Sequence, residues 1–130
     1  MRARISLLLL VPLALCLSHA PAGAASLEGT WSGAGMVNPN KGQREQVRCR
    51  ITYKRESAKV FGVTAKCATS SVKMRQTGKL LEVSPSRYVG EFYNPDYDVS
   101  GRVRVIIKGS AQTVTFESPR GTGSVTLRKN

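Results

Sequence analysis

The sequence predicts an all-β domain that folds as an antiparallel meander and is held by one disulfide. Apolar and polar residues alternate with a period of two over short runs. Clusters of glycine, proline, asparagine and serine separate these runs at regular intervals. Two cysteines lie in runs that can pair, and no segment after residue 25 has the helical spacing of apolar side chains.

The first residues have the features of a secretory signal peptide. Arg2 and Arg4 precede an apolar run over residues 5–17, and small residues follow as far as Ala25. The apolar run is shorter than the roughly 20 residues that a membrane-spanning helix needs. We therefore expect cleavage near Ala25 and a secreted or periplasmic protein.

A lipid anchor at Cys16 is the less favoured alternative, because Leu15 stands where bacterial lipoprotein signals carry a small residue. Cleavage near Ala25 leaves residues 26–130, a length that suits a single domain with one core. Nothing in this part is apolar enough to cross a bilayer.

Turn clusters divide the domain into short extended segments. The clusters read NPNKGQ, RESA, SPS, NPDYD, KGSAQ and SPRGTG, and each contains residues that favour turns. The expected strands are, in order, 27–37, 47–55, 59–67, 71–77, 79–84, 87–93, 99–108, 112–118 and 123–128.

The cysteines provide a test of the strand pairing. If Cys49 faces Cys67 in an antiparallel hairpin, Ile51 faces Ala65 and the apolar members share one face, with the turn at residues 57–59. A redox pair would more often have C-x-x-C spacing, and a metal site would need further ligands. We therefore predict a structural disulfide.

Alternation within the expected strands predicts a bulky interior that is packed rather than hollow. The expected inward residues are Trp31, Ile51, Tyr53, Phe61, Val63, Met74, Leu81, Val83, Phe92, Val103, Val105, Ile107, Val114, Phe116, Val125 and Leu127.

The chain is strongly basic, with 20 Lys and Arg against 8 Asp and Glu and a formal net charge of +12. Its only histidine, His19, lies in the leader, so the mature domain has no imidazole for a triad, a general base or a typical zinc site. It also lacks a phosphate-binding glycine loop followed by a helix. We expect no catalysis, no cofactor and no metal.

Two groups of basic residues lie on the outward face of the expected strands. The register that pairs the cysteines also pairs Arg50 with Lys66, and like charges directly opposite lower stability. The rows either solubilise an exposed sheet and protect its edges, or attract a polyanion. The candidate polyanion-binding residues are Arg48, Arg50, Lys54, Lys66, Arg102, Arg104 and Lys108.

The segment from Tyr93 to Asp98 is chemically the most mixed. Asn94 and Asp96 are typical of a turn. Asp96 and Asp98 have oxygens that suit calcium, but the further ligands of an EF-hand are absent. Tyr93 and Tyr97 beside carboxylates suit recognition of sugars or peptides, because rings stack and acids accept hydrogen bonds. Of the two functional alternatives, recognition is favoured.

Gly29, Thr30 and Trp31 form a G-x-W sequence on the first expected strand, which resembles the start of calycin-type β-barrels such as lipocalins and avidins. The resemblance implies a barrel closed at one end by Trp31, which packs on a basic residue of the last strand, here Arg128. G-x-W followed by one early disulfide also resembles the bacterial secreted metalloprotease-inhibitor barrels. Those act through a free N-terminal segment, and the mature chain has only three residues before Gly29.

We therefore expect a small antiparallel up-and-down β-barrel of about eight to nine strands with one disulfide. Its expected function is non-catalytic binding of an anionic polysaccharide, lipopolysaccharide or cell-wall polymer through the basic face. Nucleic acid is disfavoured, because most aromatic residues are expected inside. The alternative is a protein-binding barrel, or an inhibitor of a secreted or periplasmic hydrolase, that uses the loop at residues 93–98 or a sheet edge.

Overall fold

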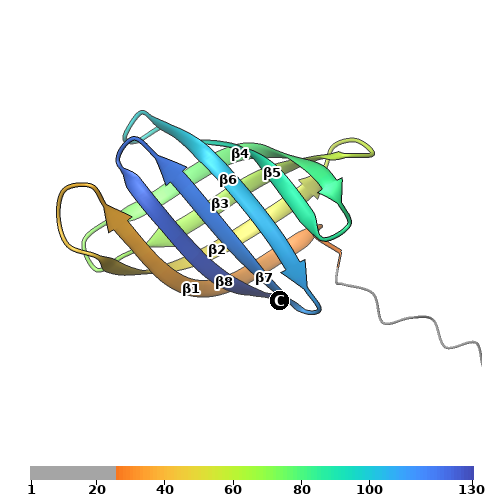
Figure 1. Ribbon diagram of the computed structural model, residues 1–130, viewed down its shortest axis with the longest axis horizontal. Helices are drawn as coiled ribbons and strands as arrows, with labels where there is room; N and C mark the ends of the chain where they lie inside the picture. Colours follow the sequence, from red (N-terminus) through yellow and green to blue (C-terminus); the bar gives the residue numbers. More distant parts are fainter. Residues whose placement is uncertain (1–25) are drawn as a thin grey trace, which may run out of the picture.

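The computed structural model describes residues 26–130, and the expected signal peptide with Cys16 lies outside the described residues. Eight antiparallel strands follow one another around a closed barrel, which confirms the predicted all-β meander (Figure 1). The strands are β1 (Gly29–Pro39), β2 (Glu45–Arg55), β3 (Val60–Ala68), β4 (Lys73–Ser84), β5 (Arg87–Asn94), β6 (Val99–Lys108), β7 (Ala111–Ser118) and β8 (Gly121–Lys129). No helix within residues 26–130 is long and apolar enough to span a membrane.

Each strand pairs with the next in the chain, and β1 also pairs with β8. This last pairing runs from Trp31 opposite Lys129 to Pro39 opposite Gly121. Closure gives every strand two hydrogen-bonded neighbours, so the barrel has no free sheet edge. The edge-to-edge docking that we weighed for a protein partner is therefore excluded.

The disulfide between Cys49 and Cys67 confirms the predicted pairing of β2 with β3. Arg50 is opposite Lys66 and Ile51 is opposite Ala65, as the sequence predicts. Because Cys49 alternates with other inward residues of β2, the disulfide lies on the inner side of the barrel wall.

The structure corrects the two strands expected at 71–77 and 79–84, which form one strand, β4. Gly78 lies in its middle, where a Cβ atom would come within 2.3 Å of the Glu91 carbonyl oxygen of β5. The glycine is therefore a point of close backbone approach rather than a break.

Continuity through Gly78 reverses the expected facing of the second half of β4. Leu80 is 1% exposed and lies in the core, whereas Leu81 and Val83 are 51% and 56% exposed and point outward. The prediction that Leu81 and Val83 lie inside was wrong, because a strand restarted after Gly78 has the opposite phase.

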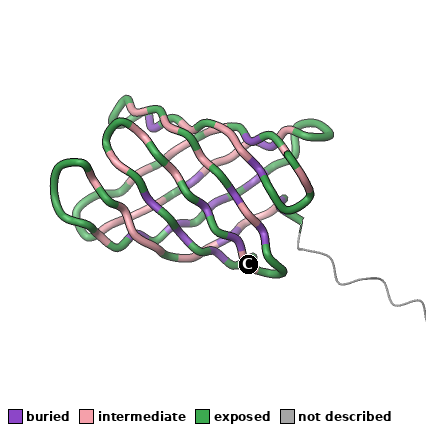
Figure 2. Tube along the Cα trace, viewed as in Figure 1, coloured by how far each residue is buried: buried purple, intermediate pink, exposed green. Residues whose placement is uncertain are grey.

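The packed core lies inside the barrel and includes Trp31, and Figure 2 shows the buried segments in purple, spread over several strands. Tyr53 donates a hydrogen bond from its hydroxyl to Gln112 Oε1 at 2.5 Å, and the Phe61 and Tyr88 rings pack edge to face. The buried apolar residues are Leu27, Trp31, Val47, Cys49, Ile51, Tyr53, Phe61, Ala65, Leu80, Tyr88, Val105, Ile107, Val114, Val125 and Leu127.

Candidate anion-binding surface

Three basic side chains stand in line across three neighbouring strands. Arg50 of β2 is opposite Lys66 of β3, and Lys66 is opposite Arg75 of β4. Arg48 and Lys73 lie one outward position further along β2 and β4. All five side chains are exposed, and we call Arg48, Arg50, Lys66, Lys73 and Arg75 the cationic face.

The cationic face borders an open groove of about 760 Å³ on the outside of the barrel. On β1, Ser32 is opposite Arg50 and Ala34 is opposite Arg48. These short side chains leave room beside the long arginines. Asp96, from the loop between β5 and β6, lines the groove at its other side.

No carboxylate lies within 4.0 Å of the cationic face in the part of the chain from residue 26 onward; the two ion pairs recorded there are Lys59 with Glu82 and Lys79 with Glu56. Neighbouring strands are roughly 4.8 Å apart, and like charges on directly opposite residues repel each other. An anion bound in the groove would relieve this repulsion.

Sequence reasoning missed Lys73 and Arg75. The alternation of Lys73, Met74, Arg75 and Gln76 was a usable signal, because it puts both basic residues on the outward face of β4. Their position beside Lys66 depends on the register across the turn at residues 69–72, which no disulfide defines.

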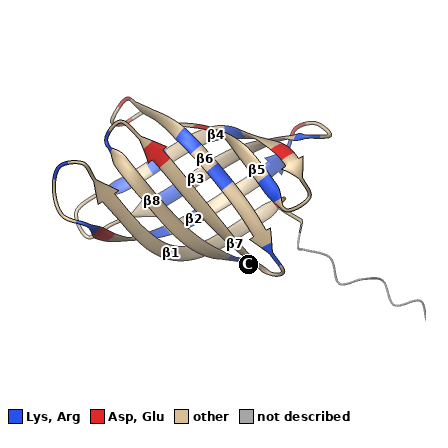
Figure 3. Cartoon of the chain, viewed as in Figure 1, with Lys and Arg blue, Asp and Glu red and all other residues tan. Residues whose placement is uncertain are grey.

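The second predicted row does not join the first. Arg102, Arg104 and Lys108 lie on β6, four strands away from β2 in a barrel of eight, and thus on the opposite side. Arg102 is flanked by acidic residues, since it is opposite both Glu91 of β5 and Glu117 of β7. The two predicted rows therefore lie on different sides of the barrel (Figure 3).

Lys54 also lies apart from the cationic face. It is four residues beyond Arg50 on β2 and is opposite Gly62. A neutral row that includes Thr52 opposite Thr64 separates the two basic positions.

The loop from Tyr93 to Asp98 is a tight turn built from its own side chains. Asn94 is buried, and its Oδ1 accepts hydrogen bonds from the backbone N–H groups of Asp96 at 3.0 Å and Tyr97 at 3.2 Å. Tyr93 donates from its hydroxyl to Asp98 Oδ1 at 3.1 Å, which raises the pKa of the Tyr93 phenol. Within residues 26–130 no three potential metal ligands cluster, there or elsewhere.

Trp31 closes one end of the barrel, but its basic neighbour is Lys129 rather than the expected Arg128. The Lys129 ammonium lies 5.8 Å from the centre of the Trp31 ring, and Trp31 Nε1 donates to the Leu27 carbonyl at 2.9 Å. Arg128 points outward, toward Ser110 Oγ at 3.4 Å. Because Lys129 is directly opposite Trp31 in the β1–β8 pair, its side chain projects from the same face.

The opposite end of the barrel is open, and several inward side chains there, including Val37, Met74 and Phe116, are only partly buried, although they pack against the core. A cavity of about 240 Å³ lies among the ends of the strands there. The Phe92 and Phe116 rings pack edge to face at 6.3 Å between centroids beside it. Its inward-facing lining includes Val37, Met74, Gln76, Phe92, Val99 and Phe116.

Ser70 and Lys73 have the S-x-x-K spacing of some serine nucleophiles that use a lysine base. This spacing brings two side chains together on a helix, but here Ser70 lies in the exposed turn before β4. Its hydroxyl donates to Glu45 Oε1 at 3.1 Å. The arrangement does not place the lysine on the serine hydroxyl.

No protein-family model and no curated protein matches this chain. Solved structures match the fold at low identity. The redesigned β-barrel mFAP1, solved bound to DFHBI, aligns with a TM-score of 0.68 and 14% identity over 79% of this chain and 94% of its own. Rv2717c from M. tuberculosis aligns with a TM-score of 0.61 and 9% identity over 80% and 92%.

A de novo designed fluorescence-activating β-barrel aligns with a TM-score of 0.61 and 17% identity over 79% of this chain and 93% of its own. Structural similarity at such low sequence identity shows that the chain folds as a small closed antiparallel barrel, but it does not indicate a function. The finer resemblance to metalloprotease-inhibitor barrels stays a prediction.

Proposed function

We propose that this protein is a non-catalytic binding module, acting outside the cytoplasm, that holds an anionic polymer of the cell envelope on its cationic face. The observation that carries the proposal is the line of Arg50, Lys66 and Arg75 across three strands, without a carboxylate in ion-pair range in the described chain. Such an arrangement lowers stability unless an anion neutralises it.

The geometry favours a polymer over a small anion. The groove is open, and its five cations are spread along two rows instead of converging on one point. A chain of anionic groups can contact several of them together and release their counterions, so that many weak contacts add up.

Among polymers, an acidic polysaccharide, a lipopolysaccharide or a cell-wall polymer fits better than nucleic acid. Single-stranded nucleic acid binders combine basic grooves with aromatic side chains on which bases stack. No aromatic residue lines the groove of the cationic face.

Salt-gradient elution from immobilised heparin and from an envelope polysaccharide tests the proposal. We expect the protein to elute above physiological salt, and the variant Arg50→Gln, Lys66→Gln, Arg75→Gln to elute much earlier. The matched control is Arg102→Gln, Arg104→Gln, Lys108→Gln, which removes the same charge from β6. If the two variants lost retention on the column equally, net charge alone would explain the retention, and the proposal would be wrong.

The barrel-end cavity supports a second candidate function, the binding of a small apolar molecule. Its volume of about 240 Å³ and its partly apolar lining, with Phe92 and Phe116, are the observations that favour it. The designed barrel mFAP1, of similar fold, was solved bound to DFHBI. An apolar fluorescent dye should bind here, and Val99→Trp, which fills the cavity, should prevent this; a dye signal unchanged in that variant contradicts the candidate.

A further inference from the structure

A group of aliphatic side chains faces solvent on the outside of β3, β4, β5 and β6. Leu81 of β4 is opposite Val60 of β3 on one side and Val89 of β5 on the other. Val83, two residues along β4, stands at an irregularity of the β4–β5 pairing and has no partner residue there. The apolar patch consists of Val60, Leu81, Val83, Val89 and Ile106.

The facing of β4 creates this patch. Because β4 continues through Gly78, it presents Leu80 to the core and Leu81 and Val83 to the outside. Leu81 and Val83 are the two most exposed large apolar residues of the described chain. The fold buries neither side chain, and a cluster of exposed apolar residues of this kind is typical of a surface that contacts a partner or a membrane.

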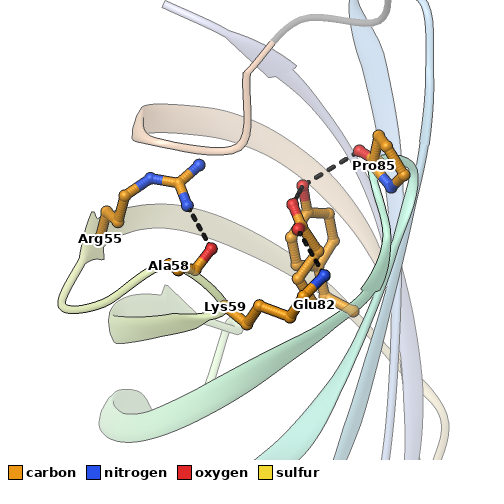
Figure 4. Close-up of polar contacts among 6 residues, drawn as sticks. Arg55, Ala58, Lys59, Glu82 and Pro85 are labelled. Atoms are coloured by element: carbon orange, nitrogen blue, oxygen red, sulfur yellow. Dashed lines mark hydrogen bonds and ion pairs between the residues drawn. The ribbon is translucent and has the colours of Figure 1, made fainter.

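Basic residues border the patch on β5 and β6. Two acidic residues, Glu56 and Glu91, line the same groove as Val60, Leu81 and Val89; Glu56 is paired with Lys79, and Glu91 is opposite Arg102. Arg104 of β6 is opposite Val89, and Arg87 of β5 is opposite Ile106, both exposed. Lys59 lies beside the patch at the turn before β3, with its ammonium 3.7 Å from Glu82 (Figure 4). We call Arg87 and Arg104 the rim arginines, and neither has a carboxylate within 4.0 Å among residues 26–130.

Polar contacts hold the two turns beside the patch in place, as Figure 4 shows. Arg55 donates from Nη1 to the Ala58 carbonyl at 2.7 Å in the β2–β3 turn. Tyr88 donates from its hydroxyl toward the Pro85 carbonyl at 3.0 Å in the β4–β5 turn. These hydrogen bonds hold the strand ends that carry the patch in a fixed conformation, so binding would cost little conformational entropy.

The positive charge of the rim arginines favours an anionic bilayer over a second copy of the chain as the surface that covers the patch. In a two-fold dimer built on this face, the rim arginines of both copies would converge at the interface, where like charges oppose association. A bilayer with anionic headgroups has the complementary arrangement, since aliphatic side chains enter the apolar boundary while arginines contact the headgroups.

We propose that the apolar patch docks onto an anionic lipid bilayer, with Leu81 and Val83 entering the interface and the rim arginines on the headgroups. This membrane site is separate from the cationic face, which lies around Arg50, Lys66 and Arg75. The barrel would then lie on a bilayer while the cationic face remains free for a polymer.

Co-flotation of the mature protein with vesicles is the test. Vesicles of phosphatidylcholine with phosphatidylglycerol should carry the protein, and vesicles of phosphatidylcholine alone should carry much less. Arg87→Gln with Arg104→Gln should weaken partition roughly 30-fold, and Leu81→Ser with Val83→Ser roughly tenfold or more. Val72→Ser, at an exposed valine of the β3–β4 turn, is the matched control and should change nothing.

Fluorescence gives a direct readout of insertion. In Leu81→Trp the new indole emission should shift to the blue on anionic vesicles, whereas in Val72→Trp it should not. Trp31 is fully buried and adds the same background to both.

Two results would overturn the inference. One is loss of flotation in the Arg50→Gln, Lys66→Gln, Arg75→Gln variant with full retention in Leu81→Ser, Val83→Ser, because the lipid would then lie on the cationic face. The other is a dimer in sedimentation velocity that Leu81→Ser with Val83→Ser dissociates, because a second copy would then cover the patch. Heparin retention is measured on the same variants. Vesicle flotation tests the apolar patch and heparin retention tests the cationic face, so either proposal can fail without the other.

Discussion

The Lys129 ammonium lies 5.8 Å from the centre of the Trp31 ring and donates a hydrogen bond to the Ser26 carbonyl at 2.8 Å. This one side chain joins the last strand to the first strand and to the segment before it. Lys129→Ala should therefore lower the free energy of unfolding by roughly 1 kcal/mol, as measured by urea denaturation. Arg128→Ala is the control and should have little effect, because Arg128 points outward; the reverse order of effects would contradict the described closure.

Removal of the disulfide should destabilise the barrel considerably. Cys49 and Cys67 are 18 residues apart, and a crosslink over a loop of that length contributes roughly 3 kcal/mol in the chain-entropy model. Urea unfolding of the oxidised protein and of Cys49→Ala with Cys67→Ala measures the difference. A difference near zero would mean that the native hairpin does not depend on the crosslink.

The facing of β4 can be tested with two neighbouring leucines. Leu80→Ala should lower the free energy of unfolding by roughly 2–5 kcal/mol, because it leaves a cavity in the core. Leu81→Ala should change it by less than about 0.5 kcal/mol, because the side chain is already in solvent. Thermal or urea unfolding of both variants distinguishes the continuous strand from one that restarts after Gly78.

Gly78 itself should resist substitution. In Gly78→Ala the new Cβ would meet the Glu91 carbonyl oxygen at 2.3 Å, so the two backbones must move apart. We expect a loss of roughly 1–3 kcal/mol in the free energy of unfolding. Thr77→Ala, at the adjacent exposed position, is the control.

The stability of the protein should fall at alkaline pH because of Tyr53. Burial raises the pKa of the Tyr53 phenol far above its ordinary value of 10.0. The folded state therefore keeps the proton where the unfolded state releases it, so the contribution is complete below pH 10 and declines as the pH rises above it. The free energy of unfolding should fall by up to about 1.4 kcal/mol per pH unit from this group, and urea unfolding between pH 9 and pH 11.5 measures it. In Tyr53→Phe the free energy of unfolding should fall less steeply with pH, by that amount.

The register and the facing of β2 and β3 could be predicted, since the cysteine spacing gave the register, the alternation gave the faces, and the two agree; the strand bounds differ by one or two residues. The candidate site could be predicted only in part. Arg48, Arg50 and Lys66 lie on this hairpin, whereas Lys73 and Arg75 come from a strand that no crosslink positions. Alternation also predicted the outward facing of Arg102, Arg104 and Lys108, but it could not predict on which side of the closed barrel they lie relative to β2.

Local patterns in the sequence by themselves determined the all-β class, most of the turns, the disulfide and the inward residues of β2, because each depends on residues close in the chain or on one crosslink. Tertiary structure alone decided the continuity of β4 at Gly78, which follows from the approach of the Glu91 backbone. It also decided that Lys129 and not Arg128 covers Trp31, because that depends on the register between the first strand and the last. Closure couples strands far apart in sequence, and no local pattern contains that coupling.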